Sequence, residues 1–194
     1  MSVPSGSSLS DLPADLPEPV DDGAAGHLEG MRLPPVVLPC TAGSEVDLST
    51  LAGRQVIYVY PMTGRPGVPL PDGWDAIPGA RGCTPQSCAF RDHHAELAAL
   101  RTSVYGLSTQ TRAYQQEART RLHLPFHLLS DTGRALGSAL HLPTFDAAGM
   151  TLYRRLTLIA HDARIVKVFH PVFPPDRNAG DVLAWLRTQP LPEA

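Results

Sequence analysis

The sequence predicts an α/β sandwich built around a mixed β-sheet, and three observations support this class. Short runs rich in β-branched and aromatic residues alternate with segments of helical periodicity, the last two strands form a hairpin, and a helix closes the chain. The chain has 194 residues, of which 43% are hydrophobic, so it can bury one core without disulfides or metals. We therefore expect one folded domain.

The expected elements run from an N-terminal β-hairpin to the C-terminal helix. Residues 35–39 and 46–48 predict the hairpin strands, and the apolar run 55–60 predicts a buried strand. A helix is expected from about Thr84, as N-cap with Pro85 in the first turn, to about Leu100. The remaining elements are expected as strands at 104–108, 127–130, 155–160 and 165–169, and as helices at 111–122, 132–140 and 179–188.

Two segments have the composition of irregular structure. Residues 1–30 are dominated by Ser, Pro, Asp, Gly and Ala and cannot bury enough apolar surface to offset their ordering entropy. We expect them to form a loose or wrapping arm in front of a single domain at 31–194. Residues 61–82 contain five Pro and five Gly, and a loop this long inside a compact domain is usually functional.

Charge and composition argue against several functional classes. The chain has 16 basic and 19 acidic residues and no long basic run, so nucleic acid and anionic membranes are poor candidates as partners. No apolar stretch is long enough to span a bilayer, and residues 1–20 lack the pattern of a secretory signal. Three cysteines do not form a secreted disulfide framework. The predicted compartment is the cytoplasm.

Cys83 and Cys88 are the candidate reactive groups. They stand where the Gly- and Pro-rich loop turns into the expected helix. The unpaired N–H groups and partial positive charge of a helix N-terminus favour a thiolate, which is the form that attacks peroxides and disulfides. A second cysteine nearby gives any oxidised product of the first a partner. The pattern predicts redox chemistry.

Helix geometry constrains this pair. Cys83, Phe90 and Leu97 are spaced by seven, so the sulfur of Cys83 is expected on the core face of the helix. In an ideal helix the Cα atoms of Cys83 and Cys88 lie about 8.7 Å apart, whereas a disulfide needs roughly 4.4 to 6.8 Å. Either the first turns unwind on oxidation, or no intramolecular disulfide forms.

From about residue 31 to residue 189 the chain resembles the peroxiredoxins of the Q-type, or bacterioferritin-comigratory-protein, subfamily. Five segments carry the resemblance in order: Tyr58-Val59-Tyr60-Pro61, Cys83-Thr84-Pro85-Gln86-Ser87-Cys88-Ala89-Phe90-Arg91-Asp92, Tyr105-Gly106-Leu107-Ser108-Thr109, Leu128-Leu129-Ser130-Asp131 and Arg155-Leu156-Thr157-Leu158-Ile159. The resemblance implies a thioredoxin-like sandwich and an atypical 2-Cys, thioredoxin-dependent peroxidase acting on hydrogen peroxide or organic hydroperoxides.

The same resemblance implies the roles of individual residues. Cys83 would be the peroxidatic cysteine that becomes a sulfenic acid, and Cys88 the resolving cysteine that forms a disulfide with it. A thioredoxin-like reductant would then open that disulfide. Arg155 would support the thiolate and the departing oxygen, with Arg154 as the alternative if the register is off by one, and Pro61 would shield the pocket. The resemblance also implies a monomer, and no cofactor is expected.

Two departures from the family pattern concern the substrate pocket. Family members usually have Thr or Ser three residues before the peroxidatic cysteine and Pro four further back, but this chain has Ala80 and Ala76. If the 61–82 loop bulges out and returns, Thr63 could supply the hydroxyl; alternatively, peroxide is bound without it. The loop residues Leu70, Trp74 and Ile77 could wall the pocket or contact a reductant. These departures sustain a second hypothesis, a redox sensor or disulfide-transfer protein that uses the same cysteines. A third hypothesis, a non-catalytic interaction module, would leave the cysteine pair and Arg155 without a role.

The other cysteine and the histidines favour simpler roles. Cys40 is expected to be a packing residue of the hairpin and is the reserve candidate for the resolving cysteine. His93 and His94 are adjacent on the expected helix and face different ways, so packed or solvated roles are expected. No His-x-x-x-His motif or Cys/His cluster with zinc spacing is present, so no metal is predicted.

Overall fold

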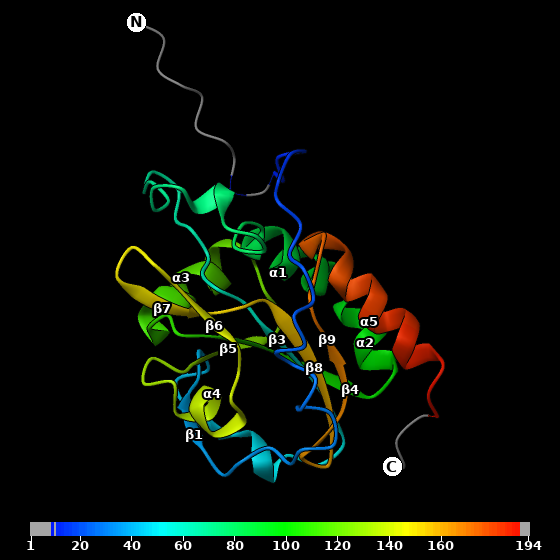
Figure 1. The fold of residues 1–194 in the computed structure, drawn as a ribbon. Coiled ribbons are helices and arrows are strands. Elements are labelled where there is room, and N and C mark those ends of the chain that lie inside the picture. The colour runs from blue at the N-terminus through cyan, green and yellow to red at the C-terminus, as the bar shows by residue number, and fades with distance from the viewer. Residues whose placement is uncertain (1–8, 10, 191–194) are drawn as a thin grey trace, which may run out of the picture.

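The computed structural model describes residues 9 and 11–190, and its centre is a five-stranded mixed sheet (Figure 1). The strand order is β5-β4-β3-β8-β9. The first three of these strands are parallel, whereas β8 is antiparallel to β3 and β9 to β8. The strands span β3 Arg54–Val59, β4 Thr102–Ser108, β5 His127–Ser130, β8 Leu156–His161 and β9 Arg164–Phe169. The expected α/β sandwich around a mixed sheet is confirmed.

Different elements cover the two faces of the sheet. Helices α1, α2 and α5 pack on one face, while α4, the β1–β2 hairpin and part of the N-terminal segment pack on the other (Figure 1). Helix α3 contacts the edge strand β5. The helices span α1 Cys83–Asp92, α2 His94–Ala99, α3 Arg112–Arg121, α4 Ala135–Leu140 and α5 Asn178–Arg187, and the hairpin strands are β1 Val37–Pro39 and β2 Glu45–Asp47. Among the described residues, no helix is both long and apolar enough to cross a membrane.

Strand β3 divides the core in two. All six of its residues are buried, as predicted for a central strand. Its side chains alternate, so Tyr58 joins the core under α1 and α5, whereas Ile57 and Val59 join the core under α4 and the hairpin. A residue's place in either core therefore shows on which face of the sheet it lies.

The helix expected from Thr84 to Leu100 differs from the structure at both its start and its middle. It is two helices, α1 and α2, interrupted at His93. Helix α1 begins at Cys83, and its N-cap is Gly82 rather than Thr84. Gly82 has φ +100°, and a Cβ at this position would lie 2.3 Å from the Cγ atom of Pro175. Glycine allows both this conformation and the close approach, and Cys83 consequently falls inside the first turn.

A second hairpin was not predicted. Strands β6 (Thr144–Ala147) and β7 (Met150–Tyr153) pair through a two-residue turn, Ala148-Gly149, in which both residues have positive φ. Such turns usually carry Asn, Asp or Gly at the first position. Alanine at that position removed the sequence signal.

The 61–82 loop has a small core of its own. It contains one turn of 3-10 helix, η2 (Trp74–Ala76), and its buried Trp74 and Ala80 pack with Leu152 of β7. Leu70 and Ile77 are half-buried against the same cluster. The loop is therefore braced by the second hairpin, and the indole of Trp74 is enclosed rather than offered to a partner.

The N-terminal segment lies along the domain. Ala25 and Leu28 are buried in the core under α4, and the N–H group of Gly30 donates to the carbonyl of Ile165 at 2.8 Å. Residues 1–8 and 10 of the expected arm lie outside the described residues. The division into an arm at 1–30 and a domain at 31–194 stays a prediction.

Candidate active site

Cys83 is the first residue of α1, and its thiol is buried with 3% exposure. The Nη2 group of Arg155 donates to its sulfur at 3.2 Å. As a thiol, Cys83 can donate to the carbonyl of Ala80 at 3.7 Å. A guanidinium and a helix N-terminus both stabilise negative charge on sulfur. The structure therefore brings the predicted Cys83 and Arg155 into direct contact.

Backbone carbonyls at the end of the long loop hold Arg155 in place. The guanidinium donates to the carbonyls of Gly79 at 3.2 Å, Ala80 at 3.1 Å and Arg81 at 3.0 Å. Arg155 directly precedes β8, and it is only 3% exposed. The loop that lacks the family hydroxyl thus supplies the acceptors that orient the arginine.

A buried amide chain continues from Arg155. Its Nη1 group donates to Oε1 of Gln86, and Nε2 of Gln86 donates to Oδ1 of Asn178 at 3.0 Å. The hydroxyl of Thr157 donates to the same Asn178 oxygen at 2.7 Å. Gln86, Asn178 and Thr157 were missed in the sequence analysis. The sequence could have indicated Gln86 as a site residue, since it is three residues after Cys83 on the same helix face. It could not have indicated Asn178, which is 92 residues from Gln86.

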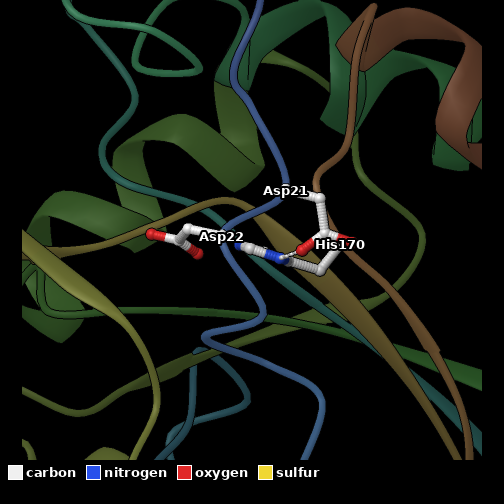
Figure 2. Close-up of side chains that lie close together, drawn as sticks. All are labelled: Asp21, Asp22 and His170. Carbon is white, nitrogen blue, oxygen red and sulfur yellow. Dashed lines mark ion pairs between the residues drawn. The ribbon is translucent and has the colours of Figure 1, made fainter.

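Arg154 points elsewhere and does not replace Arg155. It is 42% exposed and donates to Asp22 at 2.5 Å. Figure 2 shows the neighbouring group of Asp21, Asp22 and His170, whose ligand-type atoms lie within 4.8 Å of one another. Arg154 already neutralises Asp22, and both carboxylates are exposed and accept N–H groups of their own turns. The ion pairs of Asp22 with Arg154 and of Asp21 with His170 link the N-terminal segment to the domain.

Cys88 is half-buried in the second turn of α1, and all three cysteines are free thiols. Burial raises the pKa of the Cys88 thiol, and the positive charge of Arg91 opposes that rise. Because both cysteines lie within the intact helix α1, ideal geometry separates their Cα atoms by about 8.7 Å. A bond between them requires the helix to unwind.

The two residues predicted to shape the substrate pocket make no hydrogen bond to Cys83 or Arg155 among the described residues. Pro61 is buried shortly after β3. Thr63 is also buried, and its hydroxyl donates to Oε1 of Gln110 at 3.1 Å, while the Gln110 amide donates back to the Thr63 carbonyl at 3.1 Å. Their roles as substrate-binding residues stay predictions.

Arg155 also forms part of the wall of a cavity of about 310 Å³. The N-terminal segment contributes residues 18–20, the long loop contributes Ile77, and the second hairpin contributes Phe145. Cys83 is not part of this wall. The cavity therefore borders Arg155 on the side of the N-terminal segment and the long loop.

Cys40 lies on the other face of the sheet. It is 1% exposed and packs in the core under α4, whereas Cys83 belongs to the core under α1 and α5. The sheet separates the two sulfurs. This placement supports the packing role of Cys40 and argues against it as the resolving cysteine.

The adjacent histidines do not form a pair. Nδ1 of His93 lies 2.8 Å from a carboxylate oxygen of Glu96, whereas the ring of His94 packs against Phe126 with centroids 6.0 Å apart. The expected solvated and packed roles fit this arrangement.

The fold and site define a class of protein: an α/β protein with a buried thiol at a helix N-terminus, contacted by a buried arginine, which is suited to thiol redox chemistry. The model of the Redoxin family matches residues 28–183, and the chain belongs to this family. The predicted resemblance to the Q-type peroxiredoxins is confirmed by its relatives.

Among these relatives is a chloroplastic peroxiredoxin Q of Oryza sativa subsp. japonica, 28% identical over 161 residues, covering 82% of this chain and 67% of the relative. Peroxiredoxin bcp1 of Schizosaccharomyces pombe is 31% identical over 104 residues, covering 53% of this chain and 46% of the relative.

Solved structures agree on the fold. Peroxidoxin BcpB from Mycobacterium tuberculosis superposes with a TM-score of 0.67 at 25% identity, covering 84% of this chain and 97% of that one. Peroxiredoxin Q from Xanthomonas campestris has a TM-score of 0.63 at 20% identity, covering 90% and 98%, and this likeness concerns the fold alone. The predicted thioredoxin-like sandwich is confirmed.

Proposed function

We propose that the protein is a thiol peroxidase that reduces hydrogen peroxide or organic hydroperoxides with Cys83 as the attacking residue. The observation that carries the proposal is the 3.2 Å contact between the Arg155 guanidinium and the Cys83 sulfur at the start of α1. Membership of the redoxin family and similarity to proteins named peroxiredoxin support the same chemistry.

The first step breaks the O–O bond. The Cys83 thiolate attacks one peroxide oxygen and becomes a sulfenic acid, while the other oxygen leaves as alkoxide or hydroxide and takes up a proton. Negative charge moves from sulfur to the leaving oxygen during this step. Arg155 is permanently charged and has several N–H donors, so it can stabilise the negative charge first on the sulfur and then on the leaving oxygen.

The second step joins Cys83 and Cys88. The Cys88 sulfur attacks the sulfenic sulfur, an S–S bond forms and the oxygen leaves as water. A thioredoxin-like dithiol then opens this bond by exchange and is itself oxidised. Helix α1 must unwind first, and unwinding removes the burial that raises the pKa of Cys88.

Intact-mass analysis after one equivalent of hydrogen peroxide tests both steps. The wild type should lose two hydrogens. Cys83→Ser should show no change, Cys88→Ser should gain one oxygen or an adduct of the trapped sulfenic acid, and Cys40→Ser should behave as the wild type. A Cys83→Ser variant that still turns over peroxide with a dithiol donor would contradict the proposal.

One observation favours a second candidate, a redox sensor or disulfide-transfer protein. Within the described part of the chain, no hydroxyl side chain hydrogen-bonds to Cys83, and the family position of that hydroxyl is Ala80. This candidate predicts slow turnover of peroxide and a mixed disulfide with a partner protein, trapped in cells that carry Cys88→Ser. Fast turnover with thioredoxin and no trapped partner would exclude it.

We also propose a compartment, an oligomeric state and a domain organisation for the enzyme. We place the protein in the cytoplasm, as a monomer, with residues 1–30 as an arm on a domain at 31–194. Several relatives are named chloroplastic, so localisation of the tagged full chain is the direct test of the compartment. Light scattering of the reduced and oxidised protein tests the monomer.

A further inference from the structure

The helix segment between the two cysteines is fastened by two buried polar side chains. Gln86 is 0% exposed and Ser87 1%. Gln86 links Arg155 to Asn178, and the Ser87 hydroxyl lies 3.1 Å from the hydroxyl of Tyr58. Both links must break when this segment unwinds, because Gln86 and Ser87 are part of the turns that separate Cys83 from Cys88.

Asn178 holds the outer end of the Gln86 link. It is the first residue of α5, it is 2% exposed, and its Oδ1 atom accepts one hydrogen bond from Gln86 and one from Thr157 of β8. Thr157 is itself fully buried. One side-chain oxygen therefore joins α1, α5 and the central sheet, next to the residue pair that performs the first step.

We propose that Asn178 is a positioning residue that, through Gln86, holds the first turns of α1 in the wound form and so sets how readily Cys88 can reach Cys83. The proposal rests on the function proposed above. Asn178 touches neither Cys83 nor a reacting atom. It acts on the equilibrium between the wound helix, in which Arg155 contacts Cys83, and the unwound segment.

Removal of the Asn178 oxygen should change the two steps in opposite directions. The buried Nε2 group of Gln86 would lose its acceptor, which destabilises the wound form relative to the unwound one. The first step slows because Gln86 no longer fixes Arg155 firmly. The second step accelerates because the helix opens more often.

The fate of the sulfenic acid reports on this balance. It either condenses with Cys88 and releases water, or reacts with a second peroxide to give a sulfinic acid and release the corresponding alcohol or water. Faster unwinding shifts the products toward the disulfide. A uniformly loosened structure would instead slow the whole cycle.

The test compares Asn178→Ala with Asn178→Asp in excess hydrogen peroxide, by rapid quench and intact mass. In Asn178→Ala we expect the ratio of sulfinic acid to disulfide to fall, and oxidation of Cys83 to slow, each by about three- to ten-fold, as for the loss of one buried hydrogen bond. Asn178→Asp keeps an acceptor for both donors, and a carboxylate suits the first turn of α5. It should restore both values toward the wild type.

Thr157→Val provides a second variant that does not depend on the folding of Asn178→Ala. It removes one of the two donors to Asn178 and should shift the product ratio in the same direction by a smaller factor. An unchanged ratio in the folded variants, or equal slowing of both steps, would overturn the proposal.

Hydrogen exchange in the reduced protein separates this proposal from the function on which it rests. The backbone amides of Ser87 and Cys88 should exchange about ten-fold faster in Asn178→Ala than in the wild type, whether or not peroxide is turned over. If the wild type forms no disulfide, the resolving step fails while this readout still stands. If the wild type does form the disulfide but the two amides exchange equally fast in Asn178→Ala and in the wild type, only the role of Asn178 is overturned.

Discussion

Cys83 and Cys40 are both buried thiols, with 3% and 1% exposure, and they lie on opposite faces of the same sheet. The sulfur of Cys40 accepts one backbone N–H group, from Ala42 at 3.4 Å, and is otherwise packed in an apolar core. The sulfur of Cys83 stands at a helix N-terminus and receives the Arg155 guanidinium at 3.2 Å.

Burial does not select the reactive thiol in this protein. Burial by itself favours the neutral thiol, as the raised pKa of Cys88 also shows. What distinguishes Cys83 is its place at a helix N-terminus, where a buried guanidinium donates to its sulfur. The three thiols of this chain thus occupy an apolar core, a half-buried helix face and a cationic helix N-terminus.

The largest effect should come from removing each thiol in turn. Cys83→Ala should abolish peroxide turnover with a dithiol donor, whereas Cys40→Ala should keep turnover within about two-fold and lower the free energy of unfolding by about 1 kcal/mol through a small cavity. Coupled turnover assays and urea unfolding measure the two quantities. Loss of activity in a folded Cys40→Ala variant would contradict the assignment of Cys40 as a packing residue without a role in turnover.

Arg155→Met should slow oxidation of Cys83 by about 100-fold, since it removes the charged donor at the reacting sulfur. Arg154→Met is the matched control, because that exposed arginine pairs with Asp22, and it should change the rate by less than about two-fold. Stopped-flow measurements of the peroxide reaction give both rates. Equal slowing by the two substitutions would show that the adjacent arginines act only through net charge.

Gly82→Ala should disturb the entry to α1. A Cβ there would lie 2.3 Å from Pro175 at φ +100°, so we expect the free energy of unfolding to fall by about 2 kcal/mol. Gly180→Ala on α5 is the control: a Cβ there meets open space, and the helix should gain about 0.5 to 1 kcal/mol. Urea unfolding of both variants measures the contrast; a stable Gly82→Ala would show that the entry can relax.

The smallest effect concerns pH. Burial raises the pKa of Cys88 in the folded chain, so its contribution to stability is fully present below the ordinary thiol pKa of about 8.5. That contribution is lost as the pH rises through the raised, folded-state pKa. The free energy of unfolding should therefore fall more from pH ~8 upward in the reduced wild type than in Cys88→Ser. If the free energy of unfolding has the same pH dependence in both proteins, burial does not raise the pKa of Cys88.

Local sequence patterns predicted the class of the fold and the segment that carries the reactive cysteines. Strand 127–130 was predicted with the bounds that the structure gives it. Helix α3 begins at Arg112, one residue after the predicted start, and Thr111 is its N-cap. Local patterns suffice here because side-chain period and capping residues act within a few residues of chain. The sequence also placed Cys83 beside a helix start, although the expected N-cap was Thr84 and the observed one is Gly82.

Tertiary structure alone decided how the site is completed. Gln86 lies 69 residues from Arg155 and 92 residues from Asn178 in the sequence, yet it is hydrogen-bonded to both. Cys40 and Cys83 lie on opposite faces because of how their two segments pack on one sheet. The second hairpin was not predicted because Ala148 occupies the first position of its turn. The start of α1 at Cys83 was not predicted because its N-cap is Gly82, which has no capping side chain. Local propensity fixes which segments are helix or strand, but buried hydrogen bonds between distant segments exist only once the sheet and helices have packed together.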